Sequence, residues 1–232
     1  MLGGASTVLV VAFVVGCSTA VTDRSSARAA SRATTAVDAP IIPTDAYRAG
    51  DVRVAIVGDS LTAGGARLLS AGLDKNTWMA YAQGRGIAFV GGFAEGGTTV
   101  QYQASQVRPV SDVDVLVLMS GTNDVRLGYR FDRVEKYYRQ IVDTIKPKHV
   151  IIGAIPPYDR NPDGAATYER ALKAYVQHDT DWTFVDPWGF ARDGRVYLGG
   201  VSNDGIHPTT SGYRLLGANY RAAILKVADA GG

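Results

Sequence analysis

Three short polar clusters contain the residues of this 232-residue chain that are best suited to chemistry. Residues 58–61 place a serine directly after an apolar run, and residues 120–124 end in an asparagine and an aspartate. Residues 203–208 contain an aspartate three positions before a histidine. A serine, a histidine and an aspartate can together attack an ester, so these residue types predict nucleophilic catalysis.

Ser60 has the sequence surroundings that a nucleophile needs. A serine hydroxyl is a weak nucleophile until a neighbouring base takes its proton. A turn between a strand and a helix would also place the Ser60 backbone N–H at a helix N-terminus, where negative charge is favoured. We therefore predict Ser60 as the nucleophile. Taken alone, the Asp-Ser pair is more often a helix cap, so this prediction depends on the other two clusters.

His207 is the candidate base among the three histidines. We expect His149 on a surface loop before a strand and His178 at the polar end of a helix, whereas His207 lies in a loop after the predicted sheet. Asp204 can accept the proton on the second imidazole nitrogen and thereby fix the tautomer. Asn123 can present its amide to a developing oxyanion, a contribution of about 3–4 kcal/mol in other hydrolases.

Alternating strands and helices must bring these clusters together. Apolar runs predict strands at 52–57, 87–90, 113–119, 150–155 and 183–185. Periodic patterns predict helices at 66–72, 77–84, 131–145, 165–176 and 209–228. Such alternation predicts a parallel sheet with helices on both faces. Side chains that follow the carboxyl ends of its strands share one crevice, and all three clusters fall there.

Composition excludes several other classes of protein. With 46% hydrophobic and 20% charged residues, the chain is not mostly disordered, and its length suits one α/β domain with an N-terminal extension. A net charge of +2 gives no electrostatic case for nucleic-acid binding. A single cysteine and no Cys/His cluster exclude an internal disulfide and structural zinc. We predict no metal and no cofactor.

The N-terminal part differs in composition from the rest. Residues 8–15 are consecutive apolar residues, too few to span a bilayer but typical of the core of a signal peptide. The following stretch is rich in Ser, Thr, Ala and Arg and predicts a flexible tether. We therefore predict a signal peptide at 1–16, a tether at 17–49 and a catalytic domain at 50–232, in an exported protein.

Residues 14–17 resemble a bacterial lipobox, in which the signal is cut before the cysteine. The resemblance implies that Cys17 is lipidated and anchors the protein to the outer face of the bacterial cell membrane. Plain secretion, with Cys17 incidental, is the alternative. Beyond this anchor we predict no membrane partner, and the sequence makes no prediction of the oligomeric state.

The three polar clusters resemble, in order, the motifs of the SGNH (GDSL-type) hydrolases. Residues 58–61 resemble the first block, 121–124 the third and 204–208 the fifth, over about 180 residues of chain. The resemblance implies a three-layer α/β/α sandwich, flavodoxin-like, with about five parallel strands. It also implies a metal-free serine esterase or lipase mechanism, with Ser60 as nucleophile and with His207 as base, oriented by Asp204.

The resemblance implies an oxyanion hole of three donors. These are the Ser60 N–H, the Asn123 side chain and a glycine N–H of the second block, which corresponds to residues 94–99. Alignment with the family favours Gly96, and the adjacent Gly97 stays an alternative.

The predicted function is hydrolysis of carboxylic acyl esters through an acyl-enzyme intermediate. An acyltransferase, or a deacetylase of cell-wall or other polysaccharide, would use the same residues, and a non-catalytic glycan-binding module is the third alternative. The predicted loops are short and include no apolar insertion that could form a lid. This favours small or soluble acyl esters over long lipids, in a small-molecule or glycan substrate. We expect Asp59 and Asp124 to cap or support the site, and Tyr158 is a candidate for lining the cleft.

Overall fold

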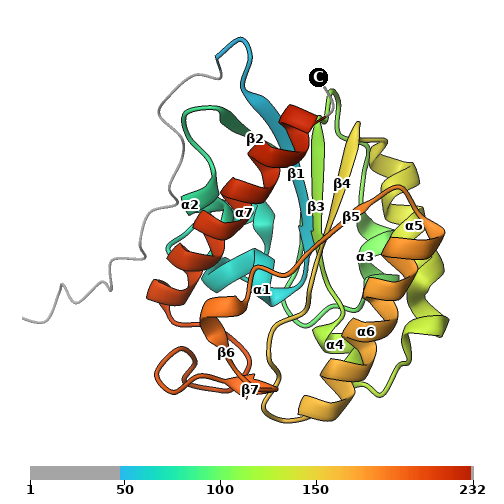
Figure 1. Ribbon diagram of the computed structural model, residues 1–232. Helices are drawn as coiled ribbons and strands as arrows, with labels where there is room; N and C mark the ends of the chain where they lie inside the picture. The colour runs from blue at the N-terminus through green and yellow to red at the C-terminus, as the bar shows by residue number, and fades with distance from the viewer. Residues whose placement is uncertain (1–47, 231–232) are drawn as a thin grey trace, which may run out of the picture. The chain divides into compact units, whose positions relative to one another are not determined.

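The computed structural model describes residues 48–230, which form a parallel sheet covered by helices on both faces (Figure 1). The predicted signal peptide, Cys17 and the tether up to residue 47 lie outside the described residues. The sheet has the strand order β2-β1-β3-β4-β5, and each neighbouring pair is parallel. The predicted three-layer α/β/α fold with five parallel strands is confirmed.

The bounds of the elements are as follows. The strands are β1 (Val52–Gly58), β2 (Ile87–Ala94), β3 (Val115–Met119), β4 (His149–Gly153) and β5 (Thr183–Val185), with a separate antiparallel hairpin of β6 (Arg192–Asp193) and β7 (Val196–Tyr197). The α-helices are α1 (Ser60–Ala63), α2 (Met79–Ala82), α3 (Val100–Gln106), α4 (Thr122–Arg126), α5 (Phe131–Ile145), α6 (Pro162–Asp179) and α7 (Thr210–Ala230). Within residues 48–230, no helix is long and apolar enough to cross a bilayer.

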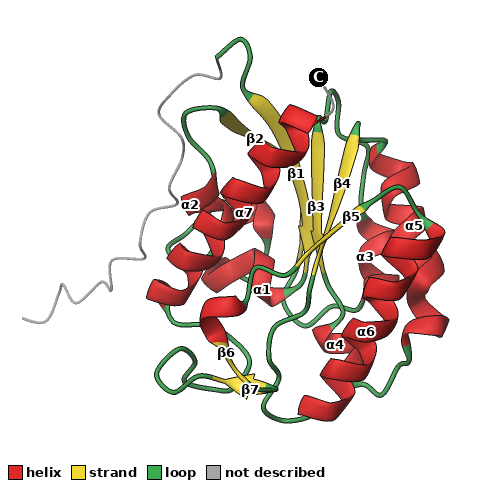
Figure 2. Ribbon diagram, in the orientation of Figure 1, coloured by secondary structure: helices red, strands yellow, loops and turns green. Residues whose placement is uncertain are grey.

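The central strands are apolar throughout because both faces of the sheet are covered. In β1, Val54 and Ile56 face one hydrophobic cluster and Ala55 and Val57 face the other, as the two-residue period of a strand requires. Figure 2 shows α2 and α7 on one side of the sheet and α3, α5 and α6 on the other.

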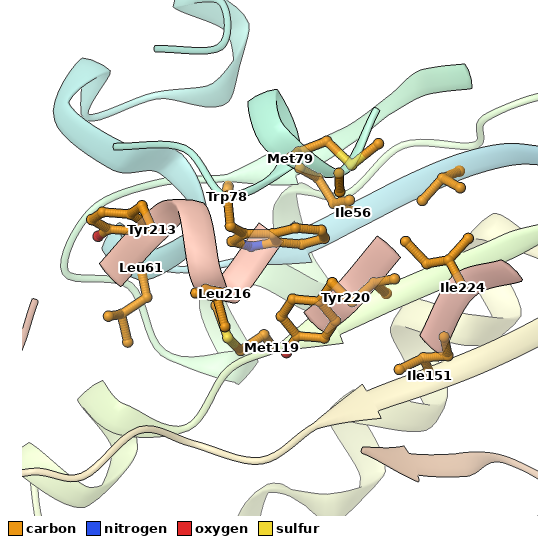
Figure 3. Close-up of a cluster of buried hydrophobic side chains, with 14 of the residues drawn as sticks. Ile56, Leu61, Trp78, Met79, Met119, Ile151, Tyr213, Leu216, Tyr220 and Ile224 are labelled. Carbon is orange, nitrogen blue, oxygen red and sulfur yellow. The ribbon is translucent and has the colours of Figure 1, made fainter. Parts of the chain in front are cut away.

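Helix α7 closes the first of these layers. Figure 3 shows Tyr220 of α7 against Trp78, with ring centroids 4.4 Å apart. Gly217 allows this close approach, since a Cβ there would lie 2.5 Å from the Trp78 carbonyl oxygen. Arg221 adds a hydrogen bond of 2.9 Å from Nη1 to the carbonyl oxygen of Ala82. The last helix is therefore held on α2 and the residue before it, far away in the sequence.

The predicted helix at 66–72 is wrong. The structure has two short 3-10 turns there, η1 (Gly64–Ala66) and η2 (Leu69–Ala71), bounded by glycines with φ of +70° at Gly64 and +103° at Gly72. Left-handed glycines end helices, and Arg67, with φ of +58°, separates the two turns. The helices α3 and α4 and the β6–β7 hairpin were not predicted from the sequence, because each is too short to show a period.

The carboxyl ends of three neighbouring strands lie at one edge of the sheet. Gly58 pairs with Ala94 of β2 and with Met119 of β3. The segments that follow β1, β2 and β3 therefore start side by side, at the lower edge of the sheet in Figure 1.

Candidate active site

Ser60, His207 and Asp204 form one chain of hydrogen bonds. Ser60 is the first residue of α1, directly after its cap at Asp59. Nε2 of His207 lies 2.8 Å from Oγ of Ser60, and Nδ1 of the same ring lies 2.8 Å from Oδ2 of Asp204. The fold thus brings together a serine and a histidine that are 147 positions apart, as the sequence predicted.

Asp204 also organises the loop that carries His207. Its Oδ1 accepts backbone hydrogen bonds from Ile206, at 2.9 Å, and from His207, at 2.7 Å. Desolvation raises the pKa of this carboxyl, but the hydrogen bonds from His207 and Ile206 outweigh that effect and lower the pKa to about 2. Asp204 is therefore ionised at neutral pH and faces the imidazole as a negative charge.

The position of this loop depends on a close approach at Gly205. Gly205 has φ of +71°, and a Cβ there would lie 2.7 Å from Cβ of Asp159. The Asp159 backbone N–H donates to the Gly205 carbonyl at 3.1 Å, and the Tyr197 hydroxyl donates to the Ile206 carbonyl at 2.8 Å. Sequence reasoning missed Asp159 and Tyr197, because neither belongs to a motif and both act through the backbone of the loop.

Asn123 projects from α4 next to the cap of α1. Its Nδ2 donates to Oδ2 of Asp59 at 3.2 Å, and its Oδ1 accepts from Nε of Arg126 at 3.0 Å. Opposite partners on the two amide atoms fix which way the amide faces. The second hydrogen on Nδ2 and the backbone N–H of Ser60 have no partner within residues 48–230, so both can donate to a bound group. Arg126 is a third residue whose contact sequence reasoning missed.

Two buried carboxyl groups lie behind these donors. Asp59 is fully buried, and this desolvation raises its pKa to about 6, although hydrogen bonds from the Leu61 backbone and Asn123 oppose the increase. Burial likewise raises the pKa of Asp124 to about 7; the hydrogen bond from the Val100 N–H opposes this, and the charge of Asp59 adds to it. The predicted capping role of Asp59 is confirmed, since its Oδ1 accepts from the Leu61 N–H at 3.0 Å.

The second block lies beside Ser60, but its first glycine amide is occupied. The Gly96 N–H donates to the Arg67 carbonyl oxygen at 2.8 Å. A Cβ on Gly96 would lie 3.7 Å from Cβ of Ser60, so this backbone passes next to the nucleophile. The adjacent Gly97 has φ of +82°, and its N–H has no partner in the described part of the chain. Gly96 can donate to a substrate only if the Arg67 carbonyl releases it.

A pocket of about 370 Å³ opens beside the nucleophile. It is lined by Ser60, Gly64, Gly65, Arg67, Asn76, Gly96, His207, Pro208 and Tyr213. Across residues 48–230 no group of three or more His, Cys, Asp or Glu side chains could hold a metal ion.

Two other predicted placements are wrong. Tyr158 does not line this pocket, because its side chain is only 3% exposed and packs in the cluster under α5 and α6. His149 is the first residue of β4 rather than part of a loop. The prediction that His178 lies at the end of a helix is confirmed, since it is in the last turn of α6.

Comparisons with known proteins identify the same region of the chain. Residues 56–215 match the GDSL-like Lipase/Acylhydrolase family, whereas no curated protein matches the sequence. One similar solved structure is a GDSL-like lipase from Bacteroides thetaiotaomicron, with 20% identity and a TM-score of 0.55 over 75% of this chain and 88% of that protein. Another is a member of the lipolytic protein G-D-S-L family from Veillonella parvula, with 24% identity and a TM-score of 0.54 over 74% and 96%.

A third similar structure is a family 3 carbohydrate esterase from Clostridium thermocellum. It is 17% identical, with a TM-score of 0.58 over 78% of this chain and 98% of that protein. At these identities the structures establish the shared fold, and the family match covers all three polar clusters.

Proposed function

The chain belongs to the GDSL-like lipase/acylhydrolase family and is a hydrolase, and on this basis we propose that it is an exported serine esterase acting on carboxylic acyl esters. The observation that carries the proposal is the hydrogen-bond chain from Ser60 through His207 to Asp204, at 2.8 Å for each step. This chain gives the serine a base and gives the base a fixed orientation.

In the proposed mechanism, Oγ of Ser60 attacks the ester carbonyl carbon while Nε2 of His207 takes the hydroxyl proton. The carbonyl oxygen becomes an oxyanion, and the ionised Asp204 stabilises the imidazolium. Collapse of the tetrahedral intermediate breaks the bond to the alcohol oxygen, which receives the proton from His207. Water then attacks the acyl-enzyme, again with His207 as base, and releases the carboxylic acid and free Ser60.

The oxyanion would lie between the backbone N–H of Ser60 and Nδ2 of Asn123. Each of these two groups has an N–H without a partner within residues 48–230, and Asp59 holds the Asn123 amide in place. The Gly96 N–H would be a third donor once it leaves the Arg67 carbonyl. Donors held in advance by the fold stabilise the developing charge without reorganising, which makes this the largest single electrostatic contribution.

Small acyl groups fit the site best. The pocket of about 370 Å³ is at the small end for a ligand site, and two of its lining residues are glycines of the short segment after α1. The similarity to a carbohydrate esterase supports a second candidate, deacetylation of a polysaccharide. An acyltransferase would use the same acyl-enzyme with a sugar or alcohol acceptor in place of water.

A panel of esters that varies acyl length and alcohol, including acetylated sugars, tests the proposal. Wild type should hydrolyse short acyl esters, and a fluorophosphonate probe should label it at Ser60. Absence of both turnover and labelling would favour a non-catalytic glycan-binding module. Transfer of the acyl group to an added sugar, seen by product analysis, would instead identify a transferase.

Export and anchoring form a separate part of the proposal. Residues 14–17 support cleavage before Cys17 and its lipidation, which would place the domain on the outer face of the cell membrane. Incorporation of a labelled fatty acid in wild type and not in Cys17→Ser would support the anchor. Release of unlabelled wild-type protein into the medium would favour plain secretion.

A further inference from the structure

The pocket beside Ser60 contains an unneutralised cation. We propose that Arg67 makes this site selective for esters that carry a carboxylate close to the scissile bond. The inference rests on the proposed esterase function and narrows it to a substrate class.

Arg67 is the only permanently charged residue among those that line the pocket, and none of the lining residues is acidic. Its guanidinium makes no hydrogen bond or ion pair within residues 48–230. Arg130, Arg192 and Arg195, in contrast, each pair with a carboxylate in that part of the chain. Among the lining residues, Arg67 is therefore a positive charge without a counter-ion.

The backbone of Arg67 is fixed at a defined distance from the nucleophile. Its carbonyl oxygen accepts the Gly96 N–H, and its φ of +58° is in the left-handed region. A Cβ on Gly96 would lie 3.7 Å from both Cγ of Arg67 and Cβ of Ser60. The arginine side chain and the serine side chain therefore both lie next to Gly96, and both residues line the pocket.

Neither Glu95 nor Asp74, which lie near pocket residues in the sequence, forms an ion pair with Arg67. The backbone of Glu95 forms a β-bridge with Leu68, and its carboxylate makes no ion pair with Arg67. Asp74 does not line the pocket; its Oδ1 accepts hydrogen bonds from the Asn76 N–H and the Thr77 hydroxyl.

The other polar groups of the pocket are also donors. Oδ1 of Asn76 accepts from the Thr210 hydroxyl at 2.8 Å, which leaves the two Nδ2 hydrogens without a partner in the described chain. The hydroxyl of Tyr213 has no partner there either. A guanidinium, an amide NH₂ and a phenol hydroxyl together match a group rich in acceptor oxygens, and a planar carboxylate pairs with the two N–H groups of an arginine fork.

The carboxylate can belong to either half of the ester. In a hemiester of a dicarboxylic acid it is on the acyl group, and in an ester of a uronic or hydroxy acid it is on the alcohol. Two matched pairs of probes separate these sources. The first pair is mono-para-nitrophenyl glutarate and para-nitrophenyl pentanoate, and the second is para-acetoxybenzoate and its methyl ester.

The measured quantity is the ratio of kcat/KM for the anionic member of a pair to that for the neutral member. This ratio is independent of the amount of active enzyme, so partial misfolding of a variant does not change it. Arg67→Gln should lower the ratio about tenfold in one pair, because a charge-assisted hydrogen bond is lost. Arg67→Lys should retain an intermediate ratio, and Arg133→Gln, on the exposed face of α5, should leave the ratio at the wild-type value.

The pair that responds identifies the half of the ester that carries the carboxylate. Added salt should also lower the ratio of wild type and not that of Arg67→Gln, because screening acts on the charge. Equal ratios for wild type and Arg67→Gln in both pairs would overturn the inference while the esterase function stands. If none of the four probes is hydrolysed and the fluorophosphonate does not label Ser60, the proposed esterase function is contradicted instead.

Discussion

Asn123 donates a hydrogen bond to Asp59 across 64 positions of sequence, at 3.2 Å from Nδ2 to Oδ2. This bond joins the third polar cluster to the first, beside the proposed nucleophile. Asp59 also caps α1 through the Leu61 N–H, so one buried carboxyl holds both the helix that carries Ser60 and the amide of Asn123. The two proposed oxyanion donors are therefore set by the same side chain.

Asn123→Ala removes one of these donors and should lower kcat about 100-fold to 1000-fold with little change in KM. The reason is that the amide binds the oxyanion of the transition state more strongly than the ground-state carbonyl. Steady-state kinetics with a short-chain ester measure both constants. An increase in KM at unchanged kcat would show that Asn123 stabilises the bound substrate and the transition state equally. It would contradict the assignment of Asn123 to the oxyanion hole.

Ser60→Ala and His207→Ala should each lower turnover by about 1000-fold or more, and the double variant should be no worse than either single one. The two residues act as a unit through the 2.8 Å contact from Oγ to Nε2, so neither contributes to catalysis when the other is absent. Circular dichroism should show an unchanged fold. Wild-type turnover in purified Ser60→Ala would exclude it as the nucleophile.

Asp204→Ala should retain more activity than His207→Ala, because Asp204 orients the imidazole and does not itself react. The loop also loses two backbone hydrogen bonds to Oδ1, so we expect lower kcat and lower thermal stability of the loop. Comparison of kcat for the two variants on one ester is the test. Equal activity of Asp204→Ala and wild type would mean that the imidazole needs no orienting partner.

Asp124→Asn should stabilise the protein increasingly as pH rises. The folded-state pKa of Asp124 is raised from 3.8 to about 7, so its favourable contribution is complete below 3.8 and is lost as pH rises through about 7. Each tenfold change in proton affinity corresponds to about 1.4 kcal/mol. The asparagine keeps an acceptor for the Val100 N–H and has no charge, and Oδ1 of Asp124 has no partner to lose.

Urea denaturation at about pH 4 and about pH 8 measures this effect. The difference in unfolding free energy between Asp124→Asn and wild type should be larger at the higher pH. The same difference at both values would show that the carboxyl group does not keep its proton in the folded state.

Gly205→Ala should destabilise the protein by about 1–3 kcal/mol and lower its activity, because the added methyl must displace Asp159 and with it the loop of His207. Gly194→Ala is the matched control. Gly194 also has a left-handed φ, of +59°, but a Cβ there meets nothing within 4 Å. The control should show only the cost of the left-handed backbone, about 1 kcal/mol, with wild-type kcat. Similar kcat values for the two variants would show that the contact with Asp159 does not position His207.

Local patterns predicted those elements in which one period dominates the sequence. Helix α5 has the predicted bounds, 131–145, because its apolar residues recur every three to four positions and Pro147 follows. The second half of β2 was not predicted because it contains Gly91 and Gly92, with φ of +130° and +132°. Gly92 is required there, since a Cβ would lie 1.9 Å from the Ile56 carbonyl oxygen of the next strand.

The contacts that refine the site could not be predicted, because they join segments that only the tertiary fold brings together. Ser60, Asp204 and His207 stand out by residue type and by position after strands. Nothing local to Arg67 indicates that its carbonyl will accept the Gly96 N–H. The sequence predicts a helix at 66–72, whereas the structure has two short turns there with Arg67 between them, and Arg67 lines the pocket.

Helix α7 begins three residues after His207 and docks on Trp78, Tyr81 and Ala82, close in sequence to Ser60. The base is thus fixed between the hairpin of β6 and β7 and the final helix of the described chain. A refolding molecule can complete its whole sheet and still lack a working site until this helix is seated. The rate at which ester cleavage returns after dilution from denaturant therefore reports the docking of α7. Activity should recover more slowly than the circular dichroism signal of the β-sheet.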